Sequence, residues 1–457
     1  MENNQTTIVY LIGMGPGNVD CLTKEAEQAL SQATVCIGAP RICQILEKLK
    51  TAGGICKKDQ IVYDAYKEDE VVALLEKHAG ETVAVLFSGD IGFYSGAKKL
   101  SLVLRSASRK DPNMSQDMTG TTEQINAGEI SYELHYISGL SSIPYLFDKI
   151  GQTWEDAEMV SNHGIIANIP AKVLHHAKVG TLLGGEDQVA EICTRLTEVG
   201  LGDIRVIVGE RLSYEDEKIT MKYAKGLCEK NFDKLTTAIF LNDHPELRYV
   251  SPGIPDDAFI RGNVPMTKEE VRTVVISKLG IYQGIGRKKY DPNSGQFRVD
   301  NLGAVVYDVG AGTGSVSIEM ALLMEQGSVY AIEKNPEAVE LLYANRAKFH
   351  AGNMEIVAGE ATQVIPSLPA PTHVFIGGSS GNLLEIVNMI YAKNPNACIV
   401  VTAVTMETQN ELLTISEVVK KQGKTFNMVQ LAVTRSREVG AYHMLQAENP
   451  VWIASFW

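Results

Sequence analysis

The sequence predicts an α/β protein, and three observations support this. Short apolar runs alternate with helical stretches along most of the chain, which is the pattern of a parallel sheet covered by helices. Several of these runs end directly in glycine-bearing loops, as strands do where an open α/β sheet binds its ligand. The length of 457 residues is enough for two or three domains, each with its own core.

Composition narrows the class of protein. No apolar run approaches the length of a membrane span, and acid and amide residues precede the first strand, where a signal peptide would be basic. The net charge of −13 argues against a large nucleic-acid interface, although a local cluster could still hold a small anionic substrate. Seven cysteines form no C-x-x-C pair, so a reduced cytosol is expected and a metal cage is not. We therefore expect a soluble, cytoplasmic protein.

The stretch 306–321 is the most informative part of the chain. An apolar strand at 304–309 leads into glycines at alternate positions, and an amphipathic helix is expected after them, with Val316, Met320 and Leu323 on one stripe. Glycine lets the backbone turn sharply and approach a ligand that a Cβ would keep away. The free N–H groups at the start of the following helix attract a negative group. A tight strand-to-helix connection without a ligand is the alternative interpretation.

A second strand, at 328–332, ends in Glu333, nineteen residues after Gly314. An acid at that place can hold both ribose hydroxyls of a nucleoside cofactor. The glycine spacing is G-x-G-x-G, whereas dinucleotide sites use G-x-G-x-x-G, and this favours S-adenosylmethionine over NAD. We therefore predict a Rossmann-like class I methyltransferase domain. Its predicted cofactor residues in this stretch are Gly310, Ala311, Gly312, Thr313, Gly314 and Glu333.

Two further strands extend this site. A strand at 354–357 ends in Gly359, Glu360 and Ala361, where a carboxylate and a backbone N–H could read the adenine edge. A strand at 372–376 is followed by a loop of glycine and serine. Amino-directed methyltransferases carry an Asn/Asp-Pro-Pro-aromatic loop at this place. The sequence lacks that loop, which favours carbon or oxygen as the methyl acceptor.

The first half of the chain contains a second predicted crevice. Strands at 8–12 and 83–87 run straight into glycine-bearing loops at 13–17 and 88–94. The carboxyl ends of parallel strands lie at one edge of a sheet, so the two loops are expected to face each other across a ligand site. Thr23 is the expected N-cap of the helix that follows the first loop.

A polar segment separates the two halves. Residues 242–255 contain three prolines and show no periodicity, which predicts an interdomain linker. We place the domains at 1–243 and 253–457 and the linker between them at 244–252.

Two other stretches are polar and are expected to be surface loops, at 106–130 and 282–300. The second domain is expected to begin with a loop and a helix at 268–279. Thr267, with two glutamates behind it, is the expected N-cap of that helix.

The motifs of the two halves resemble two families. Residues 1 to about 243 resemble the tetrapyrrole methylases in GMGPGNVDCLT, SGDIGFYSGA, SGLSSIPY and VSNHG. From about residue 253 onward, the chain is similar to the decarboxylating precorrin methyltransferases in GIPDDAFIRGNVPMTKEEVR, DVGAGTGSVSIEMA, AIEKNPEAVELL, GEA and FIGGSSGNL. Their order in one polypeptide resembles the fused, decarboxylating precorrin-6Y C5,15-methyltransferases of cobalamin biosynthesis.

The resemblance implies a tetrapyrrole-methylase fold of two α/β subdomains, which methylates carbon 5 of a precorrin or cobalt-precorrin. It implies a second domain that methylates carbon 15 and decarboxylates the ring C acetate. Each domain would use one S-adenosylmethionine, and the chain would form a homo-oligomer. The implied cofactor residues of the first domain are Gly13, Gly15, Pro16, Gly17, Ser88, Gly89, Asp90, Phe93, Ser141 and Ser142. The second domain adds Thr267, Glu360 and Ala361 to the residues given above.

A substrate with several carboxylates requires cationic side chains in its cleft. Arg261 is the first candidate because it lies in a motif loop, and His163 of the S-N-H-G motif is the second. Further candidates are Lys268, Arg272, Arg435 and Arg437. For each of these cations, Arg261 included, a solvated surface charge is the favoured interpretation. Two other functions stay open: an RNA or protein methyltransferase that uses the second domain alone, and a non-catalytic sensor of S-adenosylmethionine.

Overall fold

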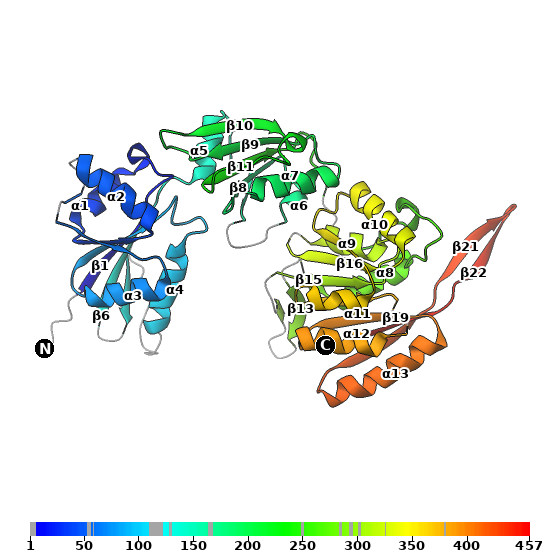
Figure 1. The fold of residues 1–457 in the computed structure, drawn as a ribbon. Coiled ribbons are helices and arrows are strands. Elements are labelled where there is room, and N and C mark those ends of the chain that lie inside the picture. The colour runs from blue at the N-terminus through cyan, green and yellow to red at the C-terminus, as the bar shows by residue number, and fades with distance from the viewer. Residues whose placement is uncertain are drawn as a thin grey trace.

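The computed structural model describes residues 6–52, 56–57, 59–108, 122–127, 130–162, 168–247, 251–282, 286–291, 296–299, 303–324, 326–378 and 381–457. Three large sheets, each accompanied by helices, follow one another along the chain (Figure 1). The predicted α/β class is therefore confirmed. Among the described residues, no helix combines the length and the apolar character needed to cross a bilayer.

The first sheet is parallel except at one edge. In spatial order its strands are β3 (Ile61–Asp64), β2 (Val35–Gly38), β4 (Thr82–Phe87), β1 (Thr6–Gly13), β6 (Ile130–Ile137) and β5 (Thr122–Ala127). Its helices are η1 (Val19–Cys21), α1 (Lys24–Gln32), α2 (Pro40–Ala52), α3 (Glu68–Lys77) and α4 (Gly96–Ser108). The Thr23 cap is confirmed, since its side chain accepts from the Ala26 N–H at 3.1 Å.

The antiparallel edge strand β5 corrects the expectation of a loop at 106–130. Within that stretch the structure describes the end of α4, the strand β5 and the first residue of β6. Ile125 of β5 is buried, and Glu123 accepts two hydrogen bonds from Arg105 at 2.6 and 2.7 Å. A single apolar residue and one ion pair are enough to fix an edge strand, and neither produces a strong sequence pattern.

The second sheet is mainly antiparallel, with one parallel pair at its edge. In spatial order its strands are β10 (Lys218–Tyr223), β9 (Arg205–Glu210), β11 (Thr236–Leu241), β8 (Lys178–Leu182) and β7 (Glu158–Ser161). Its helices are α5 (Ser142–Lys149), α6 (Ile169–His175), α7 (Gln188–Glu198) and η2 (Ala224–Gly226).

The third sheet has seven strands, and β23 alone runs antiparallel to its neighbours. In spatial order they are β17 (Met354–Ala358), β16 (Ser328–Glu333), β15 (Val305–Val309), β18 (His373–Ile376), β19 (Cys398–Ala403), β23 (Val451–Phe456) and β20 (Phe426–Leu431). Its helices are η3 (Asp256–Ala258), α8 (Glu269–Leu279), α9 (Ser315–Leu323), α10 (Pro336–Lys348), α11 (Ala361–Val364), η4 (Ile365–Ser367), α12 (Leu383–Lys393) and α13 (Met406–Lys421). The chain reverses its progress across the sheet between β15 and β18, which is where open α/β sheets bind ligands.

Two small sheets accompany the third one. Strands β12 (Ile281–Tyr282), β13 (Gly286–Asp291) and β14 (Gln296–Val299) form an antiparallel ribbon, so the expectation of a loop at 282–300 is wrong. Backbone pairing of this kind needs no alternating apolar pattern. Strands β21 (Thr434–Val439) and β22 (Tyr442–Ala447) form an exposed hairpin that projects away from the sheet (Figure 1).

Helix α9 is not amphipathic as expected. Eight of its nine residues are buried, including Glu319 at 1% exposure, and only Leu323 is partly exposed. A helix buried on every side can contain a carboxylate only if that carboxylate is paired, and Glu319 has such a partner on α8.

Candidate functional site

The carboxyl-terminal pocket is a cavity of about 260 Å³ at the point where the third sheet changes direction. It lies beside the loops that follow β15, β16, β17 and β18. The structure brings together five predicted residues here: Gly310, Gly312, Glu333, Glu360 and Ala361. Val264 and Pro265, from the segment before α8, also line it.

The backbone of the first loop requires glycine. Gly310 has φ +74°, and a Cβ on it would lie 2.8 Å from the Gly378 carbonyl oxygen. Gly312 has φ +57°, and its Cβ would lie 2.9 Å from the Pro265 carbonyl oxygen. A side chain at either position would force these backbone segments apart. The glycines therefore hold the walls of the pocket close together, besides leaving room for a ligand.

Glu333 is fixed at the wall of this pocket by backbone donors. Its Oε2 accepts from the Gly312 N–H at 2.9 Å, and its Oε1 accepts from the N–H groups of Lys334 and Asn335 at 2.8 and 2.9 Å. A carboxylate has about four acceptor positions, so one remains for a ligand hydroxyl. Lys334 pairs with Glu360 at 3.0 Å. A cavity with a glycine cradle and a fixed carboxylate fits the nucleoside part of S-adenosylmethionine.

Four other predicted residues do not line the cavity. Ala311 and Thr313 are buried, and Gly314 is the N-cap of α9, packed against Leu342. Thr267 contributes its carbonyl oxygen, which accepts from Ser315 Oγ at 3.4 Å. These residues shape the loops behind the pocket.

Thr267 is also not the cap of α8. The helix begins one residue later than expected, with Lys268 at the N-cap position and no side-chain cap of its own. Asp256 supplies the acceptor instead, since its Oδ1 accepts from the Glu269 N–H at 3.0 Å. The sequence could not show this because the capping residue lies 13 positions away.

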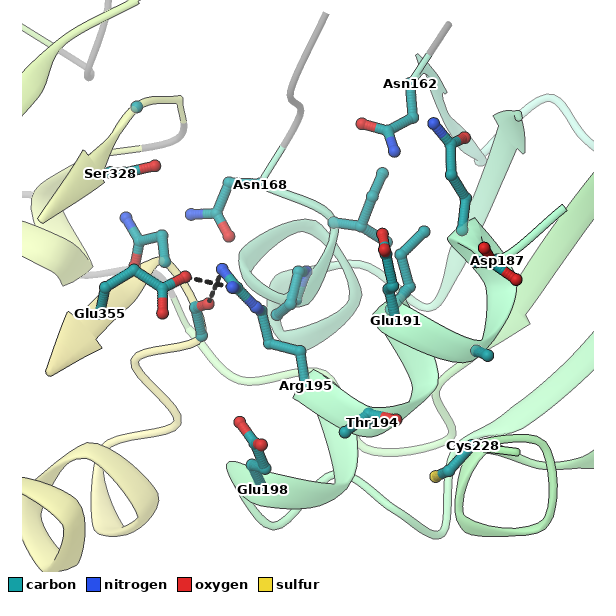
Figure 2. Close-up of a pocket in the computed structure, with 18 residues that line it drawn as sticks. Asn162, Asn168, Asp187, Glu191, Thr194, Arg195, Glu198, Cys228, Ser328 and Glu355 are labelled. Carbon is teal, nitrogen blue, oxygen red and sulfur yellow. Dashed lines mark hydrogen bonds and ion pairs between the residues drawn. The ribbon is translucent and has the colours of Figure 1, made fainter. Parts of the chain in front are cut away.

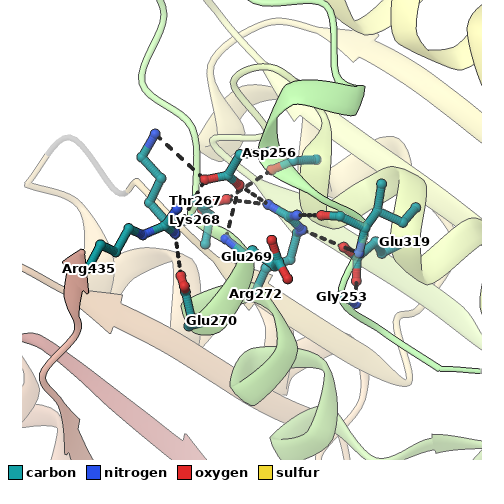
Figure 3. A network of polar contacts seen from close by, with 11 residues as sticks. Gly253, Asp256, Thr267, Lys268, Glu269, Glu270, Arg272, Glu319 and Arg435 are labelled. Atoms are coloured by element: carbon teal, nitrogen blue, oxygen red, sulfur yellow. Dashed lines mark hydrogen bonds and ion pairs between the residues drawn. The ribbon is translucent and has the colours of Figure 1, made fainter. Parts of the chain in front are cut away.

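A buried ion-pair network holds the segment before α8 against α9 (Figure 3). Arg272 is fully buried and donates from Nε to Glu319 at 2.6 Å and from Nη1 to Asp256 at 3.2 Å. It also donates to the carbonyls of Ile254 and Thr267. Glu319 in turn accepts from the backbone N–H groups of Gly253 and Ile254.

This network corrects part of the substrate-contact hypothesis. Arg272 has no exposed surface and therefore cannot reach a substrate. Arg435, at the base of the hairpin, pairs with Glu270 at 2.5 Å and Asp256 at 3.6 Å, and Lys268 lies 3.9 Å from Asp256. Their charges are already balanced by carboxylates.

The two leading substrate-contact candidates have different outcomes. Arg261 is exposed in the segment that leads to Val264 and Pro265, and its role stays a prediction. His163 lies outside the described residues. Arg437 lies on the exposed hairpin strand β21.

Asp308 is a buried carboxyl group behind the glycine loop. It is 1% exposed, and Ser317 Oγ donates to its Oδ2, while Oδ1 is buried without a hydrogen-bond partner among the described residues. Burial raises the pKa of Asp308 to about 7. In the sequence Asp308 is the only charged residue of its strand, and that pattern alone indicates no role for it.

The amino-terminal pocket is a cavity of about 500 Å³ between the first two sheets. It is lined by loops that follow β1, β4 and β6 and by residues of the second sheet. Seven predicted residues line it: Pro16, Ser88, Gly89, Asp90, Phe93, Ser141 and Ser142. The three loops come from distant parts of the chain and meet at one edge of the first sheet.

Backbone contacts lock these loops together. Gly15 and Gly89 exchange two hydrogen bonds, at 3.1 and 2.9 Å. A Cβ on Gly13 would lie 2.6 Å from the Gly139 nitrogen and 2.7 Å from the Gly89 oxygen. Asp90 accepts from the Gly139 N–H at 3.0 Å. Gly13 and Gly15 thus hold the pocket edge together and do not line it.

Gly17, the remaining predicted glycine, lies against the second sheet. A Cβ there would lie 2.4 Å from the ring of Tyr214. Tyr214 lines the pocket together with three cationic residues that the sequence did not identify: Arg41, Arg211 and Lys234. Arg41 lies shortly after β2, which ends at Gly38, and this is a usable signal, but its partners lie far away in the sequence.

A third cavity, of about 820 Å³, contains none of the predicted site residues (Figure 2). It lies between α7 and the amino ends of β16 and β17, at the edge of the third sheet opposite the carboxyl-terminal pocket. Arg195 pairs with Glu355 across it and donates to the Gly352 carbonyl at 3.3 Å. Carboxylates outnumber cations in its lining, which does not suit an anionic substrate. Among the described residues, no cluster of His, Cys, Asp and Glu is arranged to hold a metal ion.

Comparison with known proteins assigns a family model to each half of the chain. The model of the tetrapyrrole (corrin/porphyrin) methylases matches residues 8–225, and that of the precorrin methyltransferase domain matches residues 299–456. The chain is 37% identical over 209 residues to a probable cobalt-precorrin-6B C(15)-methyltransferase (decarboxylating) of Pyrobaculum aerophilum, covering 45% of this chain and 95% of the relative. It is 36% identical over 200 residues to the cobalt-precorrin-6B C(15)-methyltransferase (decarboxylating) of Salmonella typhi, and the match covers 43% of this chain and 92% of that relative.

A solved structure, titled a precorrin-6Y C5,15-methyltransferase from Geobacter metallireducens, is 33% identical and covers 45% of this chain and 96% of its own, with a TM-score of 0.38. The curated relatives are covered almost completely at more than 30% identity, and the two family models match successive parts of the sequence. The chain therefore belongs to the precorrin methyltransferase family.

Proposed function

We propose that the protein is a bifunctional, S-adenosylmethionine-dependent C-methyltransferase of cobalamin biosynthesis. In this proposal residues 1–243 methylate carbon 5 of a precorrin or cobalt-precorrin, and residues 253–457 methylate carbon 15 and decarboxylate the ring C acetate. The observation that supports two activities is the presence of two separate glycine-loop pockets, each at the carboxyl ends of strands in its own sheet.

In the carboxyl-terminal pocket, Glu333 would accept a hydrogen bond from a ribose hydroxyl at its remaining acceptor position, because three backbone N–H groups already fix its carboxylate. Glu360 and Ala361 would lie against the adenine. Gly310 and Gly312 would let the backbone approach the ligand closely. When bound, S-adenosylmethionine supplies an electrophilic methyl group on a good leaving group. The protein's contribution is therefore to position two ligands and to exclude water.

In the amino-terminal pocket, the loops that begin at Pro16, Ser88 and Ser141 would bind one cofactor molecule. The remaining volume lies toward the second sheet, where cationic residues line the cavity. Carbon–methyl bond formation uses electrons from the conjugated macrocycle itself. Decarboxylation at the other site can use the same conjugated system as an electron sink, with Arg261 as the proposed contact to a substrate carboxylate.

Product mass tests the proposal directly. The purified chain would be incubated with S-adenosylmethionine and precorrin-6B or its cobalt form. A gain of two methyl groups with loss of one carbon dioxide is the expected result. One methyl gained with that loss would leave the first domain without its proposed activity. No change with both substrates would contradict the proposal and leave a cofactor sensor as the alternative.

The assembly of the protein is proposed from the resemblance alone, and its location from the composition and the cysteine usage. We propose a homo-oligomer in the cytoplasm. Light scattering of the purified chain tests the oligomer, and a mass equal to a single chain at micromolar concentration would contradict it.

A further inference from the structure

The amino-terminal pocket contains a guanidinium, that of Arg41, whose charge no carboxylate of the described residues balances. Arg41 lies in the first turn of α2, shortly after β2, and lines the cavity. Its Nη1 donates to the Tyr214 hydroxyl at 2.7 Å, and its Nη2 donates to the Ser88 hydroxyl at 2.6 Å. Both acceptors are neutral. Within the described part of the chain, no carboxylate oxygen lies within 4.0 Å of the Arg41 nitrogens.

The other two cations of the pocket differ from Arg41 in this respect. Arg211 pairs with Asp216 at 2.6 Å, and Lys234 pairs with Glu186 at 3.5 Å. Their charges are satisfied within the protein. Arg41 is held in place by hydroxyl groups, and its charge is left for a ligand.

The position of Arg41 in its helix adds to this imbalance. The N-terminal turn of a helix has a partial positive charge and favours anions. The first turn of α2 contains no acidic residue, and it contains a cation. An anion placed beside Arg41 would relieve both the unpaired charge and the unfavourable helix position.

We propose that Arg41 binds a carboxylate of the ligand in the amino-terminal pocket and so positions that ligand for methylation. This inference rests on the proposed function, and the carboxylate can come from the macrocycle or from the amino-acid part of S-adenosylmethionine. A guanidinium has five N–H donors in one plane, and the two hydroxyl contacts fix that plane. The remaining donors suit a carboxylate, which can accept two parallel hydrogen bonds.

The test compares Arg41→Met with Arg41→Lys and with the control Lys48→Met. Lys48 lies on the same helix, is exposed, and does not line the pocket, so its variant removes the same charge elsewhere. KM for S-adenosylmethionine and for the macrocycle would be measured from the carbon-5 product mass, and S-adenosylhomocysteine binding by calorimetry. Arg41→Met is expected to weaken binding of the ligand that supplies the carboxylate, and so to raise its KM or dissociation constant by about 10- to 100-fold. Arg41→Lys should recover part of the loss.

Each outcome has a defined meaning. A rise confined to the macrocycle KM assigns the carboxylate to the substrate, whereas weaker binding of S-adenosylhomocysteine assigns it to the cofactor. The KM or dissociation constant of that ligand should also rise with salt concentration in the wild type, because salt screens the attraction between the guanidinium and the carboxylate. The rise should be smaller in Arg41→Met. Unchanged constants for both ligands, with an unchanged melting temperature, would overturn the inference. A wild-type chain that neither binds S-adenosylhomocysteine in two events nor methylates carbon 5 would instead contradict the proposed function.

Discussion

The two candidate pockets are built at the same place in a sheet but are enclosed in different ways. The amino-terminal pocket lies between two sheets and measures about 500 Å³, and the carboxyl-terminal pocket lies at the edge of one sheet and measures about 260 Å³. Three cationic residues line the first, whereas Glu333, Glu360 and Lys334 line the second. The comparison indicates that a second sheet adds volume to a pocket at the strand ends, while the cation without a carboxylate partner among the residues described, Arg41, comes from helix α2 of the first sheet.

The walls of the two pockets are also supported differently. In the amino-terminal pocket, backbone groups hold the loops, as in the paired hydrogen bonds of Gly15 and Gly89. In the carboxyl-terminal pocket, the wall at Val264 and Pro265 belongs to a segment tied down by buried charges. Removing a charge should therefore damage the second pocket much more than the first.

The largest effect is expected for Glu319→Ala. The change removes the nearer of the two carboxylates that pair with the buried Arg272, and breaking a buried pair in this way costs about 3–5 kcal/mol of unfolding free energy. Denaturant unfolding, followed by a probe in the third sheet, measures the loss. We expect the first two sheets to unfold as in the wild type.

The matched control for Glu319→Ala is the double variant Arg272→Met with Glu319→Leu. Replacing both members of a buried pair by apolar residues of similar size is often close to neutral. Recovery of most of the stability would show that the unpaired charge caused the loss. If the double variant is as unstable as Glu319→Ala, the unpaired charge is not the cause, and the loss comes from the Gly253 and Ile254 N–H groups that both variants leave without their acceptor.

The next effect is a pH dependence that we expect from the carboxyl-terminal half. The pKa of Asp308 is raised to about 7, so the folded chain keeps this proton while the unfolded chain loses it near pH 4. Its contribution to stability is complete below pH 4, decreases between pH 4 and 7, and is lost above pH 7. A pKa difference of about three units between the folded and unfolded states corresponds to at most about 4 kcal/mol of unfolding free energy.

Asp308→Asn removes this titration while keeping the shape of the side chain. The difference in unfolding free energy between the variant and the wild type should therefore grow in favour of the variant from pH 4 to pH 7. Chemical denaturation at several pH values measures it. A difference that does not change with pH would mean that Asp308 ionises in the folded protein as it does in the unfolded chain.

Local patterns predicted much of the fold. The strands predicted at 83–87 and 328–332 are observed as Thr82–Phe87 and Ser328–Glu333, because each continuous apolar run stops abruptly at its end. The strands β5, β13 and β21 were missed because polar edge strands lack such a run. Helix α9 was judged amphipathic from its sequence, since the buried partner of Glu319 lies 47 residues away.

The candidate sites show the same limit. The glycine loops could be predicted because each is a continuous motif beside its own strand. Arg41 could not, because its two hydroxyl partners lie 47 and 173 residues away and meet it only in the folded chain. The arginines that the sequence favoured were chosen for their nearness to motifs, and Arg272 proved to be part of the core. Charge alone does not separate an ion-pair partner from a substrate contact.

A smaller effect, confined to one pocket, is expected for Glu333→Ala. The variant would lose the proposed hydrogen bond between this carboxylate and a ribose hydroxyl, and a hydrogen bond to a charged group contributes about 1.5–3 kcal/mol. We expect about 10- to 100-fold weaker binding of S-adenosylhomocysteine in one of two calorimetric events. Glu333→Gln is not expected to restore binding, because in either orientation its amide NH2 would face a backbone N–H that the carboxylate now accepts. Weakening of both events together would show that the two pockets are coupled.

The smallest change in stability, and the sharpest separation of the two pockets, is expected from two glycine substitutions. Gly13→Ala places a Cβ 2.6 Å from the Gly139 nitrogen, and Gly310→Ala places one 2.8 Å from the Gly378 oxygen at φ +74°. Each should cost about 1–3 kcal/mol through forced backbone shifts. Because the affected loops belong to different sheets, Gly13→Ala should lose the carbon-5 methyl group and keep decarboxylation, and Gly310→Ala should do the reverse. Product mass measured on precorrin-6B distinguishes the two. Loss of both activities in either variant would mean that the pockets do not act independently, and the difference in their construction would then have no functional consequence.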